Sequence, residues 1–264
     1  MTGRPARATA SGVLLGLLAL LPLAGCGGGG DGDGDGDGER TLTVYAAASL
    51  TEPFEQLAEE FAATHDGVDV ELSLGGSADL VTQLQEGARA DVLATADTAT
   101  MDRLVADGLA AGEPRTFATN TLEIAVPAGN PAGVRSLEDL DGDRGLDLVV
   151  CAPEVPCGAA ALTLAELDGV TLAPVSEEQS VTDVLAKVAA GEADAGLVYV
   201  TDVATAGDDV EGIPVPEAAE VVNDYPVVAL ADSDEPALAE EFVELVLGDT
   251  GRAALAAAGF GGPR

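Results

Sequence analysis

Strand-like and helix-like segments alternate through most of the chain, and this alternation constrains the fold more than any other feature. Apolar residues run together or alternate in the strand-like segments and recur every three to four residues in the helix-like ones. The predicted strands cover residues 42–46, 68–72, 91–95, 122–127, 146–150, 195–199 and 225–230. The predicted helices cover residues 54–61, 78–86, 101–105, 159–167, 181–190, 235–247 and 250–258. This order predicts an α/β fold with mainly parallel sheets and helices on both faces.

The same order divides the chain into two similar α/β units. Residues 41–121 form the first unit and residues 122–225 the second. A further strand and two helices follow, so the chain is expected to return and complete the first lobe with residues 226–264. Two crossovers, near residues 119–126 and 223–230, would then join the lobes. This design places a ligand cleft between the lobes, beside the C-terminal ends of the strands.

The first 25 residues have the features of an export signal. Arg4 and Arg7 precede an apolar run from Val13 to Leu23, which is too short to span a bilayer as a stable helix. Leu-Ala-Gly-Cys at residues 23–26 resembles the bacterial lipobox, in which cleavage leaves the cysteine as the lipidated first residue. The prediction is a lipoprotein signal peptide over residues 1–25, with the exported protein anchored to the outer face of the cell membrane through a lipid on Cys26. An ordinary signal peptide or a short membrane anchor is the alternative.

Residues 26–40 are dominated by glycine and aspartate. Glycine loses much conformational entropy on ordering, and this segment offers nothing to bury. Residues 26–40 are therefore predicted to be a tether between the lipid and the folded body.

The charge balance excludes one large class of function. The chain has 47 Asp and Glu against 11 Lys and Arg, a formal net charge of −36, and Lys187 is its single lysine. Nucleic-acid binding depends on clustered basic residues, so no nucleic-acid partner is expected. Aromatic residues make up only 3% of the chain, which also argues against stacking platforms for bases or sugars.

Three turns at strand ends combine small, hydroxylic or glycine residues with the start of a helix. They lie at Ala46–Ser49, at Gly75–Ser77 and at Cys157-Gly158. Free backbone N–H groups at helix N-termini, with nearby hydroxyls, can hold an anion without a cation. The simpler alternative is that Ser49 and Ser77 are ordinary helix caps.

A series of motifs follows in a fixed order over about residues 41–260. The motifs are Val44–Leu50, Gly75–Ser77 with Leu80 and Gln83-Leu84, Ala90–Asp97, Pro153–Gly158, Ser180-Val181, Gly196–Tyr199 and Gly251-Arg252 to Gly259-Phe260. Together they resemble the consecutive motifs of the molybdate-binding proteins of ABC transporters. Several spaced motifs in the same order are much stronger evidence for the resemblance than any single motif.

The resemblance implies a two-lobed class II periplasmic-binding-protein fold that holds a tetrahedral oxyanion between the lobes through neutral hydrogen-bond donors. Matched by motif, Ser49 and Ser77 would give hydroxyl and backbone donors, Cys157 and Val181 backbone N–H groups, and Tyr199 its phenol. Without the resemblance, Val181 and Tyr199 are better explained as core residues.

The resemblance also implies the partners. The ligand would be molybdate or tungstate, with another oxyanion such as sulfate as the alternative, and the protein would deliver it to an ABC transporter permease. It would be a monomer without enzymatic activity or cofactor, and the only metal would be that of the oxyanion itself.

Three cysteines in an exported chain leave one unpaired, and the lipobox accounts for Cys26. Cys151 and Cys157 are then expected to form a disulfide that holds the intervening turn. A redox dithiol would instead make the protein an exported thiol oxidoreductase, but the spacing is not Cys-x-x-Cys and no neighbouring Lys or His would lower a thiol pKa.

His65 is the only histidine, which disfavours a protein-held metal. An acid hydrolase with paired carboxylates is a further alternative, but solvated helix faces explain the acids better.

Overall fold

The computed structural model describes residues 40–264. The predicted signal peptide, the lipidation site Cys26 and the tether up to residue 39 lie outside the described residues. None of the helices within residues 40–264 is long and apolar enough to cross a membrane.

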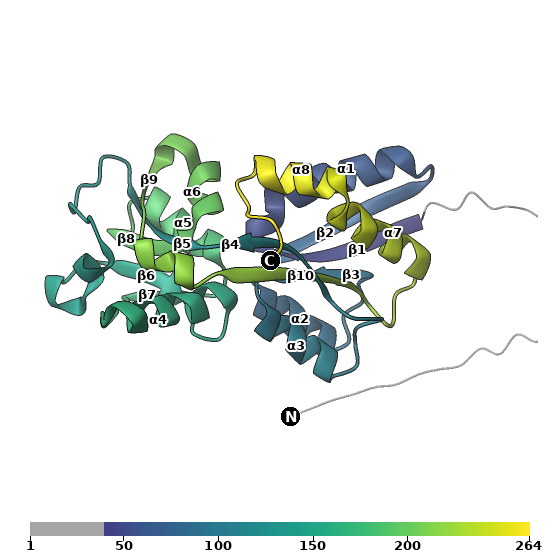
Figure 1. The fold of residues 1–264 in the computed structure, drawn as a ribbon, viewed down its shortest axis with the longest axis horizontal. Helices are drawn as coiled ribbons and strands as arrows, with labels where there is room; N and C mark the ends of the chain where they lie inside the picture. The colour runs from purple at the N-terminus through teal and green to yellow at the C-terminus, as the bar shows by residue number, and fades with distance from the viewer. Residues whose placement is uncertain (1–39) are drawn as a thin grey trace, which may run out of the picture. The chain divides into compact units, whose positions relative to one another are not determined.

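The first lobe is built on a five-stranded sheet in the order β2-β1-β3-β10-β4. Its strands are β1 Arg40–Ala47, β2 Val68–Gly75, β3 Val92–Ala94, β4 Arg115–Asn120 and β10 Asn223–Ala229. Its helices are η1 Ala48–Leu50, α1 Thr51–Thr64, α2 Ser77–Gln85, α3 Thr98–Ala106, α7 Pro236–Leu247 and α8 Asp249–Ala257. Helices α1, α7 and α8 lie over one face of this sheet and α2 and α3 over the other (Figure 1).

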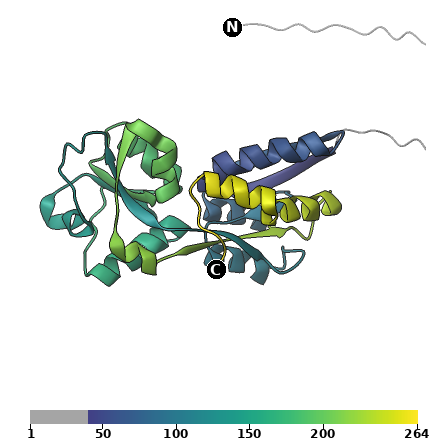
Figure 2. The same cartoon turned by 45° about the horizontal axis from the view of Figure 1, so that its top comes forward.

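The alternation of side chains along β1 explains why both faces are covered. Leu42 and Val44 point into the cluster that contains Phe54 of α1 and Phe242 of α7, whereas Tyr45 packs with the residues of α2 and α3. Successive side chains of a strand point to opposite faces, so an apolar strand requires helices on both sides. Figure 2 shows α8 lying beside α1, and the two helices are in contact.

The second lobe has a five-stranded sheet in the order β7-β6-β8-β5-β9. Its strands are β5 Leu122–Pro127, β6 Leu148–Cys151, β7 Ser176–Glu178, β8 Ala195–Tyr199 and β9 Val210–Ile213. Its helices are η2 Leu137–Leu140, η3 Gly142–Arg144, α4 Pro156–Asp168, α5 Val181–Ala189, α6 Val200–Ala206, η4 Gly207–Asp209 and η5 Pro216–Glu220.

The predicted α/β fold with helices on both faces of its sheets is confirmed, with one refinement in strand direction. In the first sheet β1 runs parallel to β2 and β3, but β10 runs antiparallel to β3 and β4. In the second sheet β6 runs parallel to its neighbours, but β5 runs antiparallel to β8 and β9. The sheets are therefore mixed, because a strand that arrives from the other lobe enters in the opposite direction.

The chain passes between the sheets twice. It leaves the first sheet after Asn120 and enters the second at Leu122, and it returns between Ile213 and Asn223. Asn120 and Asn223 are paired across β4 and β10, so the two crossovers lie side by side.

Candidate functional site

All five residues predicted to contact an oxyanion line one cavity between the two lobes. The first lobe contributes Ser49 and Ser77 and the second contributes Cys157, Val181 and Tyr199. The structure thus brings together residues that are up to 150 positions apart in the sequence. Their contact with a ligand stays a prediction.

Helix N-termini from both lobes meet at this cavity. Ser77 is the first residue of α2, Cys157 the second residue of α4 and Val181 the first residue of α5. The N–H groups in the first turn of a helix have no acceptor within that helix, and the helix dipole adds a partial positive charge there. The cavity can therefore stabilise an anion without a basic side chain.

The two serines are not helix caps, so the simpler interpretation of these residues is wrong. The N-cap residues of α1 and α2 are Leu50 and Gly76, and neither helix has a side-chain cap hydrogen bond. The Ser77 hydroxyl instead accepts a hydrogen bond from the backbone N–H of Ala96 at 3.0 Å. The Ser49 and Tyr225 hydroxyls are 3.0 Å apart.

Tyr199 ends β8 with its phenol deep in the protein, where 1% of its surface is exposed. Its hydroxyl accepts a hydrogen bond from the side-chain amide of Asn223 at 3.1 Å. Burial, with smaller contributions from Tyr225, Asp202 and Asp97, raises the pKa of Tyr199 well above its ordinary value. The phenol therefore keeps its proton at neutral pH and can act as a donor.

The Cys157 end of the site is held by covalent and steric constraints. Cys151 and Cys157 form a disulfide with their Cα atoms 5.6 Å apart. At Gly158, a Cβ atom would lie 1.8 Å from the carbonyl oxygen of Ala152, so only glycine allows this approach. The bridge and the glycine together fix the start of α4 against the end of β6.

The cavity is small and its lining is neutral. The centre of a water-sized sphere can move within about 20 Å³, which gives room for a compact ion. Its lining residues within the described part of the chain are Ala47, Ala48, Ser49, Gly75, Gly76, Ser77, Ala96, Val155, Pro156, Cys157, Gln179, Ser180, Val181 and Tyr199.

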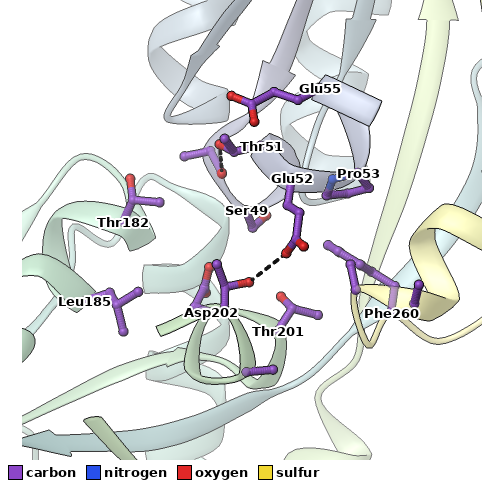
Figure 3. Close-up of a pocket in the computed structure, with 15 residues that line it drawn as sticks. Ser49, Thr51, Glu52, Pro53, Glu55, Thr182, Leu185, Thr201, Asp202 and Phe260 are labelled. Atoms are coloured by element: carbon purple, nitrogen blue, oxygen red, sulfur yellow. Dashed lines mark hydrogen bonds between the residues drawn. The ribbon is translucent and has the colours of Figure 1, made fainter. Parts of the chain in front are cut away.

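A larger opening of about 560 Å³ shares the lining residues Ala48 and Ser49 with this cavity (Figure 3). The carboxylates of Glu52, Glu55 and Asp202 line it, and the dashed line from Glu52 marks its hydrogen bond with Thr205 at 3.3 Å. These acids disfavour an anion, so the small neutral cavity is the candidate site in spite of its size.

Sequence reasoning missed the residues behind the cavity wall. Asn223 and Tyr225, both on β10, are buried and hydrogen-bond the Tyr199 and Ser49 hydroxyls. The only indication of them in the sequence is the polar pair Asn223-Asp224 at the start of the otherwise mainly apolar strand β10. Gly76 was included in a motif, but its close contact with Gln179 of the other lobe was not foreseen.

Two mixed α/β lobes around a small cavity with a neutral lining are typical of a binding protein for a small ligand. The family model of the bacterial extracellular solute-binding proteins matches residues 42–261. A ModA molybdate-binding protein of Mycobacterium tuberculosis H37Rv is 50% identical to this chain over 224 residues, which is 85% of each protein. The chain belongs to the bacterial extracellular solute-binding protein family, and within it to the ModA group.

Further relatives agree with this assignment. The Escherichia coli K12 molybdate-binding protein ModA is 31% identical over 220 residues, covering 78% of this chain and 83% of that protein. Among solved structures, the periplasmic molybdate-binding protein of Azotobacter vinelandii superposes with a TM-score of 0.69 at 24% identity, over 84% of this chain and all of that one. The sulfate-binding protein SubI of M. tuberculosis gives 0.68 at 22% identity, over 84% of this chain and 86% of that one. At these identities the two structures show the fold alone.

Membership of this family confirms an extracytoplasmic binding role and gives no support to an oxidoreductase or hydrolase. The ligand of such a protein is cargo for a transporter and not a cofactor. Within residues 40–264, no three His, Cys, Asp or Glu side chains are placed to hold a metal ion. His65 makes a hydrogen bond with Glu241 at 2.8 Å.

Proposed function

We propose that this protein captures molybdate or tungstate for an ABC importer and holds the oxyanion in the cavity between Ser49, Ser77, Cys157, Val181 and Tyr199. The observation that carries the proposal is the meeting of these five residues, from both lobes, around one small neutral cavity. The names of the relatives support molybdate as the ligand.

Hydrogen bonds alone can account for useful affinity. A buried dianion without a Lys or Arg partner must exchange its hydration for oriented donors, and each hydrogen bond to a charged group contributes about 1.5–3 kcal/mol. The hydroxyls of Ser49, Ser77 and Tyr199 and the N–H groups of the helix starts supply about five to seven such bonds. After the cost of closing the lobes, this sum is compatible with micromolar or tighter binding.

A ligand panel tests the proposed function directly. Molybdate, tungstate, sulfate, phosphate and thiosulfate are added separately to the purified protein, and thermal stability is measured. A ligand at a hundred times its Kd stabilises the folded state by about 2.7 kcal/mol. We expect molybdate and tungstate to stabilise the protein at micromolar concentrations. Stabilisation by sulfate alone would mean that the ligand is sulfate and not molybdate or tungstate. No response to any oxyanion would contradict the proposed function.

We also propose that the mature protein is a monomer, anchored to the outer face of the cell membrane by a lipid on Cys26, and that it docks on a transporter permease. The lipobox-like sequence at residues 23–26 supports the anchor. Cys26→Ser should release the protein from the membrane fraction, because the lipid would be its only hydrophobic attachment. Retention of this variant in the membrane fraction would contradict the lipid anchor.

A further inference from the structure

Asn223 makes hydrogen bonds with residues of both lobes that line the candidate site. It is the first residue of β10, where the chain returns to the first lobe, and 7% of its surface is exposed. Its side-chain nitrogen is 2.9 Å from the backbone oxygen of Ala96 and 3.1 Å from the Tyr199 hydroxyl oxygen. No ligand-contact role was predicted for it from the sequence.

The contact with Ala96 determines which way the Asn223 amide points. A backbone oxygen can only accept, so the amide group that faces it must be the NH₂ and not the carbonyl. The two amide hydrogens then go to the Ala96 oxygen and to the Tyr199 oxygen. Tyr199 is thus the acceptor in its bond with Asn223, and its one proton is left for another partner.

The backbone of the same residue, Ala96, also contacts the opposite wall of the cavity. The Ala96 N–H donates to the Ser77 hydroxyl oxygen at 3.0 Å, while the Ala96 oxygen accepts from Asn223. The Ser77 proton is therefore also left for another partner. Ser77 and Tyr199 line the cavity from different lobes, so both hydroxyls can donate into it.

The other polar groups that face Tyr199 do not change its role as acceptor from Asn223 and donor to another partner. The Tyr225 hydroxyl is near the phenol, and Asp202 and Asp97 are the carboxylates whose charges act on it. The side chain of Asp202 already accepts from the backbone N–H of Tyr199 at 2.9 Å, and that of Asp97 from the N–H of Thr100 at 2.8 Å. In the absence of a ligand, Tyr225 is the remaining polar neighbour for the Tyr199 proton.

We propose that Asn223 is a positioning residue that fixes Tyr199 as a donor and thereby makes the cavity selective for oxyanions without an acidic proton. The inference rests on the proposed oxyanion site. A protonated oxyanion such as hydrogen phosphate needs at least one acceptor in the site, and the Ser77 and Tyr199 hydroxyls, both held as donors, do not offer its proton one. Asn223 therefore determines specificity without touching the ligand.

Two substitutions separate polarity from packing. Asn223→Asp replaces the donor by a carboxylate that accepts the Tyr199 proton, whereas Asn223→Leu removes the donor without adding charge. Asn130→Asp is the matched control, because the Asn130 amide also donates to a backbone oxygen, that of Val134 at 2.7 Å, on a turn away from the cavity. Calorimetry with molybdate and with phosphate at pH 5.5 and pH 8 measures affinity for each variant relative to the unchanged protein.

We expect both Asn223 variants to bind molybdate at least about tenfold more weakly at pH 8, and Asn130→Asp to bind normally. Burial raises the pKa of a carboxyl group, so Asn223→Asp should regain a donor and most of its affinity at pH 5.5, whereas Asn223→Leu should not. The preference for molybdate over phosphate should also fall in Asn223→Asp. Affinities within about twofold of the unchanged protein would overturn the proposal, as would an equal loss in both variants with no dependence on pH and no change in preference.

A ligand-free measurement separates this inference from the proposed function. The tyrosine Fermi doublet in the Raman spectrum reports whether a phenol donates or accepts, and the difference from Tyr199→Phe isolates Tyr199. If the protein binds no oxyanion, the proposed function fails. A change of the Tyr199 signal in Asn223→Asp, from a phenol that both accepts and donates to one that only donates, would still support the positioning role. An unchanged signal would contradict it.

Discussion

Gly76 and Gln179 belong to different lobes, yet a Cβ atom on Gly76 would lie 2.1 Å from the backbone oxygen of Gln179. Both residues line the candidate site. The backbone of Gly76 has φ −61° and ψ 129°, which any residue can adopt, so glycine is required here only by the contact between the lobes. This contact closes the cavity at one edge.

Gly76→Ala should therefore weaken ligand binding by preventing full closure, while each lobe keeps its fold. We expect at least about a tenfold loss of molybdate affinity by calorimetry, with the ligand-free melting temperature nearly unchanged. Small-angle X-ray scattering should show less compaction on addition of molybdate than in the unchanged protein. Gly112→Ala is the control, because a Cβ there meets no atom within 4 Å. Normal affinity of Gly76→Ala would show that the backbones of residues 76 and 179 can move apart without weakening the binding of molybdate.

Ser77→Ala should reduce both affinity and stability. The hydroxyl is a proposed ligand donor, whose loss costs about 1.5–3 kcal/mol of binding, and it also accepts the buried N–H of Ala96. That N–H would lose its partner, so the free energy of unfolding should fall by about 1–3 kcal/mol. Calorimetry and urea denaturation measure the two effects, with Ser73→Ala in β2 as the control. A loss of stability with unchanged affinity would mean that Ser77 is structural only.

The fold was predictable from the sequence to the extent that local spacing determines it. A short apolar run located β1 and alternating apolar residues located β2, and the Ala-Ala-Ala-Ser and Gly-Gly-Ser turns located the first-lobe wall of the cavity. Strands β4, β7 and β9 were not predicted. Strands β7 and β9 have only three or four residues and too little periodicity to recognise, and β4 has mostly polar residues. The antiparallel direction of β10 depends on the return of the chain, which no local pattern encodes.

The residues behind the site were not predictable for a similar reason. The contact of Tyr225 with Ser49 spans 176 positions, and that of Asn223 with Ala96 spans 127. Each depends on how the crossovers pass between the lobes. The sequence motifs identify residues that face the ligand, but not those that orient them.

Asp202 predicts a dependence of stability on pH. Burial raises the pKa of its carboxyl group from 3.8 to about 7, although the N–H of Tyr199 donates to it. Between these two values the folded protein binds more protons than the unfolded chain, so this residue makes stability fall as the pH rises from about 4 to 7. Asp202→Asn should remove this slope and be more stable than the unchanged protein at pH 8, by an amount on the order of a few kcal/mol. Parallel slopes for the two proteins in denaturant titrations would contradict the raised pKa.

The dependence of the association rate on salt distinguishes a site of neutral donors from a cationic one. A site built on Lys or Arg attracts anions over long distances, so added salt slows association. Here the lining is neutral and the chain has a net charge of −36, so the long-range force on a dianion is repulsive. Raising NaCl from about 10 to 150 mM shortens the Debye length from roughly 30 to 8 Å, which should speed association. Hydrogen bonds inside the closed cavity are screened much less, so dissociation should change little. Stopped-flow rates at several salt concentrations measure both steps, and an association rate that falls steeply with salt would require a cationic binding site elsewhere in the protein.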